Sequence, residues 1–308
     1  MPLLDESANG VYVIAATPFS DEGALDLESA DRMVDFYRER GADGLTLLGI
    51  MGEAPKLTAE ESVAFVRRVI ARVNARLPII VGVSSPGLAS LKALAASAMD
   101  DGAAGVLVAA PSTLRTDDHI FSYFESVAET LGAIPFALQD YPLASGVQIA
   151  PKVILRIAEA LPTCVMLKHE DWPGLAKISA LRAASDKGAR RLSILTGNGG
   201  LFLPEELQRG ADGAMTGFAY PEMMVGVVKA HRAGDRDKAQ DIFDAYLPLA
   251  RYEQQQGIGL AVRKYVLAKR GAIASSALRK PGVKLSPVDI AEVERLVARQ
   301  ERRLREIG

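Results

Sequence analysis

The 308-residue chain has only one cysteine and three histidines, the residues that mark disulfide-bonded proteins and many metalloproteins. Its single cysteine, Cys164, cannot form a disulfide within the chain, so we expect a protein of the reducing cytoplasm. The three histidines, His119, His169 and His231, lack the spacing of a metal site, so we expect no bound metal. No apolar run approaches the ~18 residues of a membrane span. The first ten residues also lack the basic and apolar segments of a signal peptide.

An excess of charge of either sign is also lacking. The 36 Lys and Arg residues face 38 Asp and Glu residues, which gives a formal net charge of −2. Because no basic excess can neutralise a phosphate backbone, we expect no nucleic acid as a partner. Because no apolar run is long enough to span a bilayer, we expect no membrane partner either. Aromatic residues make up only 6% of the chain, whereas hydrophobic residues make up 49%. The apolar residues are mainly Ala, Leu, Val and Ile, which is typical of parallel strands covered by helices.

Short apolar runs recur along the chain with helical segments between them. Their spacing of roughly 20–35 residues matches a strand, a crossover helix and two loops. After residue 220 only helical patterns remain. We therefore predict an α/β fold, a (β/α)₈ TIM barrel over residues 1–222, with a C-terminal helical extension over residues 223–308 packed on it. The eight runs are Val11–Ala16, Gly44–Leu48, Ile79–Val83, Gly105–Ala110, Ile134–Leu138, Cys164–Leu167, Leu192–Leu195 and Gly213–Thr216.

Local signals mark the ends of several helices. Asp26 is a predicted N-cap for a helix over Leu27–Arg40, and Thr58-Ala59-Glu60-Glu61 has the pattern of a capping box. Three Gly-Ala-x-Gly segments follow helices and precede apolar runs, so their first glycines are predicted to end helices in the left-handed conformation. These glycines are Gly41, Gly102 and Gly210. The predicted C-terminal helices are Met223–Ala233, Arg236–Gln255, Gly259–Arg270 and Pro287–Arg305.

Lys168 has the most informative position in the sequence. It is the one lysine that directly closes an apolar strand, and reactive groups of such barrels lie where strands end. Partial burial there would lower the pKa of an ammonium group, and a free amine attacks ketones to form imines. The alternative is a structural ion pair between Lys168 and a carboxylate such as Glu170. Position alone favours neither.

Three other strand ends are candidates with plain structural alternatives. Gly49-x-x-Gly52-Glu53 could present backbone N–H groups to an anion, or be a tight loop. Gln139-Asp140-Tyr141-Pro142 offers groups that handle protons, or simple turn chemistry. Asn198-Gly199-Gly200 could hold a phosphate after the seventh strand, although no Lys or Arg follows closely.

Together these motifs resemble the dihydrodipicolinate synthase / N-acetylneuraminate lyase family of Schiff-base barrels. The resemblance extends over nearly the whole chain and is carried by Thr17-Pro18-Phe19, Leu48–Glu53, Pro142, Gly146 and Lys168. It implies that Lys168 forms an imine with a 2-oxo acid. It further implies a homotetramer built as a dimer of dimers, with no metal or organic cofactor.

The chain departs from the synthases of that family where they carry a proton relay. They have Gly-Thr-Thr-Gly-Glu where this chain has Gly49-Ile50-Met51-Gly52-Glu53, and a Tyr pair where it has Ser112-Thr113. Their catalytic Tyr is replaced by Gln139, with Tyr141 two residues on, and their substrate-binding Arg by Ala144. Without the Thr–Tyr–Tyr relay, the condensation of pyruvate with aspartate semialdehyde is disfavoured.

One branch of the family is closer in its strand-5 motif. Gln-Asp-x-Pro followed by Ala144-Ser145-Gly146 is similar to the 2-keto-3-deoxy-L-arabonate dehydratases, as is Gly213–Gly217 before Tyr220-Pro221. We predict a lyase that acts on a small 2-oxo acid, either pyruvate or a 2-keto-3-deoxy sugar acid, by aldol-type chemistry or dehydration. The alternatives are a dihydrodipicolinate synthase proper, a catalytically silent 2-oxo-acid binder, and an unrelated phosphate-binding barrel.

These interpretations define a predicted site. In it, backbone amides near Ile50 and Met51 hold the substrate carboxylate, and the proton carrier is left open among Gln139-bound water, Asp140, Tyr141 and Glu53. The predicted catalytic residues are Lys168, Gln139, Asp140 and Tyr141. The predicted substrate-binding residues are Gly49, Ile50, Met51, Gly52, Glu53, Thr216 and Gly217.

Overall fold

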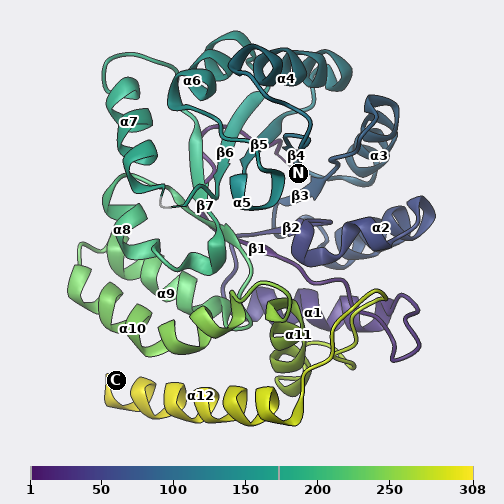
Figure 1. Ribbon diagram of the computed structural model, residues 1–308, viewed down its shortest axis with the longest axis vertical. Coiled ribbons are helices and arrows are strands. Elements are labelled where there is room, and N and C mark those ends of the chain that lie inside the picture. Colours follow the sequence, from purple (N-terminus) through teal and green to yellow (C-terminus); the bar gives the residue numbers. More distant parts are fainter. Residues whose placement is uncertain (1, 173, 308) are drawn as a thin grey trace.

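A closed barrel of eight parallel strands forms the centre of the computed structural model, which describes residues 2–172 and 174–307 (Figure 1). The strands follow one another around the barrel in chain order, and β8 pairs with β1. Each predicted apolar run overlaps one strand, so the TIM-barrel prediction is confirmed. The strands are β1 (Gly10–Ile14), β2 (Gly44–Leu47), β3 (Ile79–Gly82), β4 (Gly105–Ala109), β5 (Phe136–Asp140), β6 (Cys164–His169), β7 (Ser193–Thr196) and β8 (Gly213–Thr216).

Helices surround the barrel and continue past its last strand (Figure 1). The first eight are α1 (Leu27–Glu39), α2 (Ala59–Val73), α3 (Leu88–Asp101), α4 (Asp117–Leu131), α5 (Pro142–Ser145), α6 (Pro151–Ala160), α7 (Leu175–Ser185) and α8 (Leu203–Gln208). The four predicted C-terminal helices are also present, as α9 (Pro221–Arg232), α10 (Arg236–Glu253), α11 (Gly259–Lys269) and α12 (Pro287–Glu306). No helix in the described chain is both long and apolar enough to cross a membrane.

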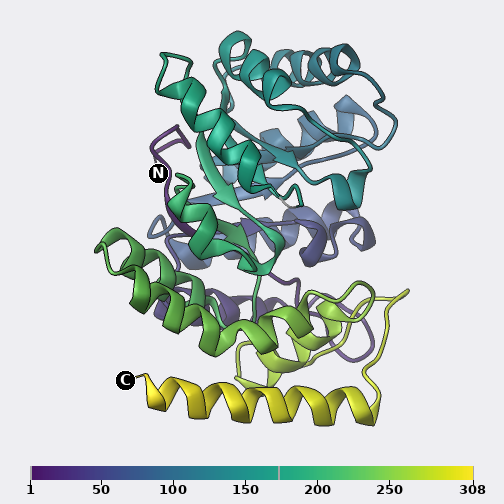
Figure 2. The same cartoon turned by 60° about the vertical axis from the view of Figure 1, so that its left-hand side comes forward.

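The C-terminal helices pack as a layer on one side of the barrel. Helix α9 contacts β1 and α8, α10 packs on α9, and α12 packs on α10. Figure 2 shows α12 in yellow, running along the outside of this layer. The division of the chain at residue 222 stays a prediction, since α9 begins at Pro221 and lies against the barrel.

The predicted helix signals act as expected. The Asp26 side chain accepts a hydrogen bond from the Ser29 N–H at 2.9 Å and so caps α1. Thr58 and Glu61 form the reciprocal bonds of a capping box at the start of α2. The three helix-ending glycines have φ angles in the left-handed region, at 83° for Gly41, 106° for Gly102 and 96° for Gly210.

Side chains alternate between the barrel interior and the surrounding helices, as the two-residue period of a strand requires. The interior holds its own apolar cluster, which includes Ile14, Leu107, Ala137, Met166, Leu195 and Met215. On β5 and β6 the positions two residues beyond Ala137 and Met166 are Gln139 and Lys168. A register shift between β5 and β6 at Phe136/Ala137 sets Gln139 directly opposite Lys168. The barrel therefore brings an amide and an amine together at its C-terminal mouth.

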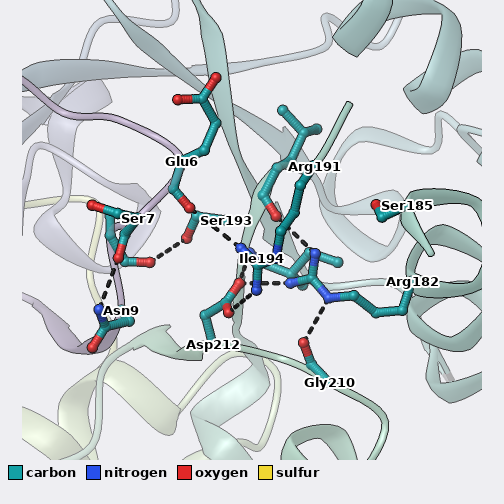
Figure 3. A network of polar contacts seen from close by, with 12 residues as sticks. Glu6, Ser7, Asn9, Arg182, Ser185, Arg191, Ser193, Ile194, Gly210 and Asp212 are labelled. Carbon is teal, nitrogen blue, oxygen red and sulfur yellow. Dashed lines mark hydrogen bonds and ion pairs between the residues drawn. The ribbon is translucent and has the colours of Figure 1, made fainter. Parts of the chain in front are cut away.

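A polar network closes the opposite end of the barrel (Figure 3). Asp212, just before β8, accepts hydrogen bonds from Arg182 Nη2 at 2.6 Å and from the Ile194 N–H at 2.8 Å, and it also pairs with Arg191. The Ser193 hydroxyl donates to the Ala8 carbonyl at 2.6 Å. This network joins the starts of β7 and β8 to the N-terminal segment. It lies away from the mouth, so its role is in stability.

Glu206 on α8 is a buried carboxyl group behind the strands. It is 7% exposed, and its Oε2 has no hydrogen-bond partner within the described residues. Burial raises the pKa of Glu206 from 4.5 to about 7. Between about pH 4.5 and pH 7, the Glu206 carboxyl group therefore holds its proton in the folded protein but releases it in the unfolded chain.

This burial predicts a pH-dependent stability. Between about pH 4.5 and pH 7 the unfolded state binds fewer protons than the folded state, so the free energy of unfolding falls as pH rises, by about 3 kcal/mol in total. Glu206→Gln should remove this decline. Denaturant unfolding from pH 4.5 to 8 measures it, with the exposed Glu125→Gln as the control. An unchanged slope in Glu206→Gln would contradict the prediction.

Candidate active site

A narrow cleft opens around Lys168 at the C-terminal ends of the strands. A second hollow adjoins it, sharing Ile50, Gln139 and Tyr141. The space thus continues beyond the lysine, toward β4 and α5. The cleft is lined by Ile14, Ile50, Met51, Gln139, Tyr141, Lys168, Glu170, Asn198, Gly199, Thr216, Gly217, Gln254 and Arg263.

Lys168, Glu170 and Gln139 form the polar centre of this cleft. Lys168 is 4% exposed, and its Nζ lies 2.9 Å from Glu170 Oε2. The Gln139 Nε2 donates a hydrogen bond to the same oxygen at 2.6 Å. One carboxylate oxygen therefore faces the amine while an amide holds it in place. The predicted ion pair between Lys168 and Glu170 exists, but it lies inside the cleft.

The backbone around Glu170 is fixed by its neighbours. Its N–H donates to the Asp140 carbonyl at 2.8 Å, and its own carbonyl accepts from Asn198 Nδ2 at 3.2 Å. The Glu170 side chain also lies against Gly197, where an added Cβ would be 2.1 Å from Glu170 Cγ. Position 197 must lack a side chain for the carboxylate to reach Lys168.

Tyr141 adds a phenol to the same cleft. Burial, and then the nearby charge of Glu170, raise the pKa of Tyr141 above its ordinary value of 10. The phenol therefore stays protonated at neutral pH and is available as a hydrogen-bond donor. Gln139 and Tyr141 share the cleft, although the strand ends at Asp140 between them.

The loop after β2 places Ile50 and Met51 at the cleft and keeps its glycines behind it. Residues Ile50–Gly52 form a short 3₁₀ helix, whose first N–H groups have no partner inside the helix. The Gly52 N–H donates to the Gly49 carbonyl at 2.9 Å, and the Gly52 carbonyl accepts from the Thr17 hydroxyl at 2.5 Å. Gly49 and Gly52 therefore shape the turn without lining the cleft.

The structure places Asp140 outside the cleft. Asp140 follows Gln139 on β5, so it points outward, where it pairs with Lys177 at 2.7 Å and lies 3.5 Å from His169 Nδ1. Strand alternation therefore separates it from Lys168.

Glu53 also lies away from the cleft lining. Its φ of 55° turns the chain away, and its carboxylate pairs with Lys264 at 2.6 Å and with Lys56 at 2.9 Å. This buried group anchors the loop to α11. Of the four candidate proton carriers, only Gln139 and Tyr141 line the cleft together with Lys168.

Several cleft residues were missed from the sequence. The sequence suggests Glu170 as an ion-pair partner of Lys168 or, with His169 and Asp171, as a weak candidate for a cation site, whereas two-residue alternation puts Lys168 and Glu170 on the same inner face. Asn198 and Gly199 were considered only as a phosphate-binding turn. No sequence signal pointed to Gln254 or Arg263, because they come from the helical extension. Within the described residues, no group of three or more His, Cys, Asp or Glu side chains is arranged to hold a metal ion.

A family model for the dihydrodipicolinate synthetase family matches residues 7–300. The chain belongs to this family. Among its curated members, the L-2-keto-3-deoxyarabonate dehydratase of Azospirillum brasilense is 32% identical over 289 residues, which cover 92% of each chain. Other relatives in the dihydrodipicolinate synthetase family carry the name 4-hydroxy-tetrahydrodipicolinate synthase. The relatives thus include both a dehydratase and synthases.

Solved structures of the dihydrodipicolinate synthetase family agree with this fold. A structure described as dihydrodipicolinate synthase from Rhodopseudomonas palustris is 54% identical, with a TM-score of 0.95 over 97% of this chain and 100% of that chain. A prophage protein of the family from E. coli K12, solved in complex with pyruvate, is 25% identical, with a TM-score of 0.86 over 95% of this chain and 98% of that chain. The family's fold therefore covers nearly the whole chain.

Proposed function

We propose that this chain is a Schiff-base dehydratase for a 2-keto-3-deoxy sugar acid, with Lys168 as the imine-forming residue. One observation carries the proposal: a carboxylate, Glu170, lies 2.9 Å from the buried amine of Lys168. The name of the Azospirillum relative supports the same reaction class. The pyruvate complex of the E. coli relative supports a 2-oxo acid as the ligand type.

In the first step, Lys168 attacks the C2 ketone of the substrate. Glu170 is close enough to take the proton from the ammonium group, which frees the amine as a nucleophile. The carbinolamine then loses water, with that proton returned to the leaving hydroxyl, and an iminium remains. The free N–H groups of Ile50 and Met51 are suited to the C1 carboxylate.

In the second step, the iminium makes a C3 proton acidic. Glu170 accepts that proton, and the C3–H electron pair forms the enamine. The enamine then expels the C4 hydroxyl, which takes the same proton from Glu170 and leaves as water. Hydrolysis of the resulting conjugated iminium frees Lys168. Gln139 holds the carboxylate through both transfers, and Tyr141 donates a hydrogen bond without losing its proton.

The alternative is a condensation with a second, charged substrate, a reaction suggested by the synthase name of the Rhodopseudomonas relative. The composition of the adjoining hollow argues against it. Its described lining has no charged side chain: it consists of Ile50, Ala109, Ala110, Ser112, Gln139, Tyr141, Ala144 and Ser145. A wall of hydroxyls, an amide and methyl groups suits a neutral polyol chain better than an ionised amino acid.

Borohydride trapping tests the proposal. In parallel samples, the enzyme is incubated with pyruvate or with a 2-keto-3-deoxy pentonate and then reduced with borohydride. Intact-mass measurement and peptide mapping locate the adduct. We expect an adduct on Lys168 with both ligands and release of water from the pentonate alone. An adduct without turnover would indicate a silent binder, and condensation of pyruvate with aspartate semialdehyde would indicate a synthase. The absence of any adduct would overturn the proposal.

A further inference from the structure

Arg263 brings a guanidinium group from the helical extension into the barrel mouth. It lies on α11, is 1% exposed, and is one of the residues that line the cleft around Lys168. The mechanism proposed above gives it no part. A buried arginine beside a substrate cleft therefore needs its own explanation.

Two of the three guanidinium nitrogens of Arg263 have hydrogen-bond partners in the protein. Nε donates to Glu253 Oε1 at 2.7 Å, and Nη2 donates to the Gly217 carbonyl. Nη1 has no hydrogen-bond partner in the part of the chain that the structure describes. A buried donor without an acceptor is costly, so an acceptor at this place stabilises the site.

Gly217 shows on which side of β8 this free donor lies. Met215 belongs to the interior cluster, so the position two residues on faces the same way, toward the mouth. A Cβ at position 217 would lie 1.9 Å from Arg263 Nη1. The guanidinium therefore fills the space that a side chain at 217 would take, on the cleft side of the strand.

Glu253 removes the net charge of this arginine. Its carboxylate is 1% exposed, pairs with Arg263, and accepts from the Ala219 N–H at 3.0 Å. The Arg263–Glu253 pair thus offers a donor without a net positive charge. Such a donor suits a neutral hydroxyl oxygen better than a second carboxylate. Gln254, next to Glu253, adds an amide to the same wall beside Gly199.

We propose that Arg263 Nη1 binds a hydroxyl oxygen of the substrate beyond the imine carbon and so selects hydroxylated 2-oxo acids over pyruvate. This inference rests on the proposed function, because it assumes that the substrate is tethered at Lys168. It makes the helical extension a part of the specificity site.

Pyruvate provides the test, because it has the carboxylate and the ketone but no hydroxyl. In Arg263→Lys, which retains a cation for Glu253 but lacks Nη1, we expect kcat/KM for a 2-keto-3-deoxy pentonate to fall about 10–100-fold. The pyruvate concentration for half-maximal borohydride trapping should change by less than about threefold. Gly217→Ala, which displaces the guanidinium, should give the same selective loss.

A double variant and a control guard against a general structural effect. Glu253→Gln/Arg263→Met removes the donor without leaving a buried charge unpaired, and it should show the same selective loss. Arg270→Lys, at the end of the same helix and paired with Glu222, should leave both readouts unchanged. Equal weakening for pentonate and pyruvate, or no change for either, in variants that melt like the wild type would overturn the inference. If the wild-type enzyme gave no borohydride-reduced adduct on Lys168, that result would instead refute the proposed function.

Discussion

Lys168→Ala is expected to abolish the borohydride-trapped adduct and to lower turnover on the order of 10⁴–10⁶-fold. The physical reason is the loss of the amine that makes C3 acidic, since no other lysine lines the cleft within the described residues. Mass spectrometry of the reduced enzyme and a steady-state assay on the 2-keto-3-deoxy pentonate measure the two effects. Near-normal turnover in this variant would end the Schiff-base interpretation.

Lys168→Arg is the matched control for charge. A guanidinium keeps a cation next to Glu170 but does not form an imine at neutral pH. The variant should therefore fold with its ion pair in place and still give no adduct. If it were active, the role of Lys168 would be electrostatic and not covalent.

Glu170→Gln is expected to lower kcat by about 10²–10⁴-fold, while the adduct on Lys168 still forms at equilibrium but more slowly, because Glu170 also takes the proton from the ammonium group. The amide keeps the size of the side chain but does not accept the C3 proton. Trapping with pyruvate reports imine formation, and exchange of the C3 protons with deuterated water reports the lost proton transfer. Normal exchange in Glu170→Gln would assign the proton to another group.

Two further variants sharpen this prediction. Gly197→Ala leaves the carboxylate in the sequence but moves it, because the added Cβ would overlap Glu170 Cγ, so it should reproduce much of the loss. Asp171→Asn changes the next carboxylate along the chain, which pairs with Lys177 outside the cleft lining, and it should retain turnover.

The barrel and its central lysine were predictable because both depend on local patterns. Apolar runs of four to six residues at regular spacing specify parallel strands, and glycines such as Gly102 specify the turns between helix and strand. Lys168 follows from its place at the end of such a run. Cleft positions for Gln139, Tyr141, Ile50 and Met51 follow from the same rule that reactive groups lie at strand ends.

The features of the site that the sequence could not predict depend on which face of a strand a side chain occupies and on contacts between residues distant in the sequence. Asp140 is next to Gln139 in the chain but on the opposite face, and the register shift that sets Gln139 opposite Lys168 has no local sequence signal. Arg263 reaches the cleft only because Gly217 lacks a side chain, and these residues lie 46 positions apart. Such pairings are decided by packing of the whole fold.

The buried pair of Glu53 and Lys264 has a consequence for the order of synthesis. The two residues are 211 positions apart. A ribosome adds about 5–20 residues per second, so Glu53 waits on the order of 10–40 s for its partner. Until Lys264 has been synthesised, the Glu53 carboxylate in the loop after β2 lacks the ion-pair partner that it has in the folded protein, so this loop is not yet anchored to α11. Productive folding of this chain is therefore expected to be completed only after α11 has emerged from the ribosome.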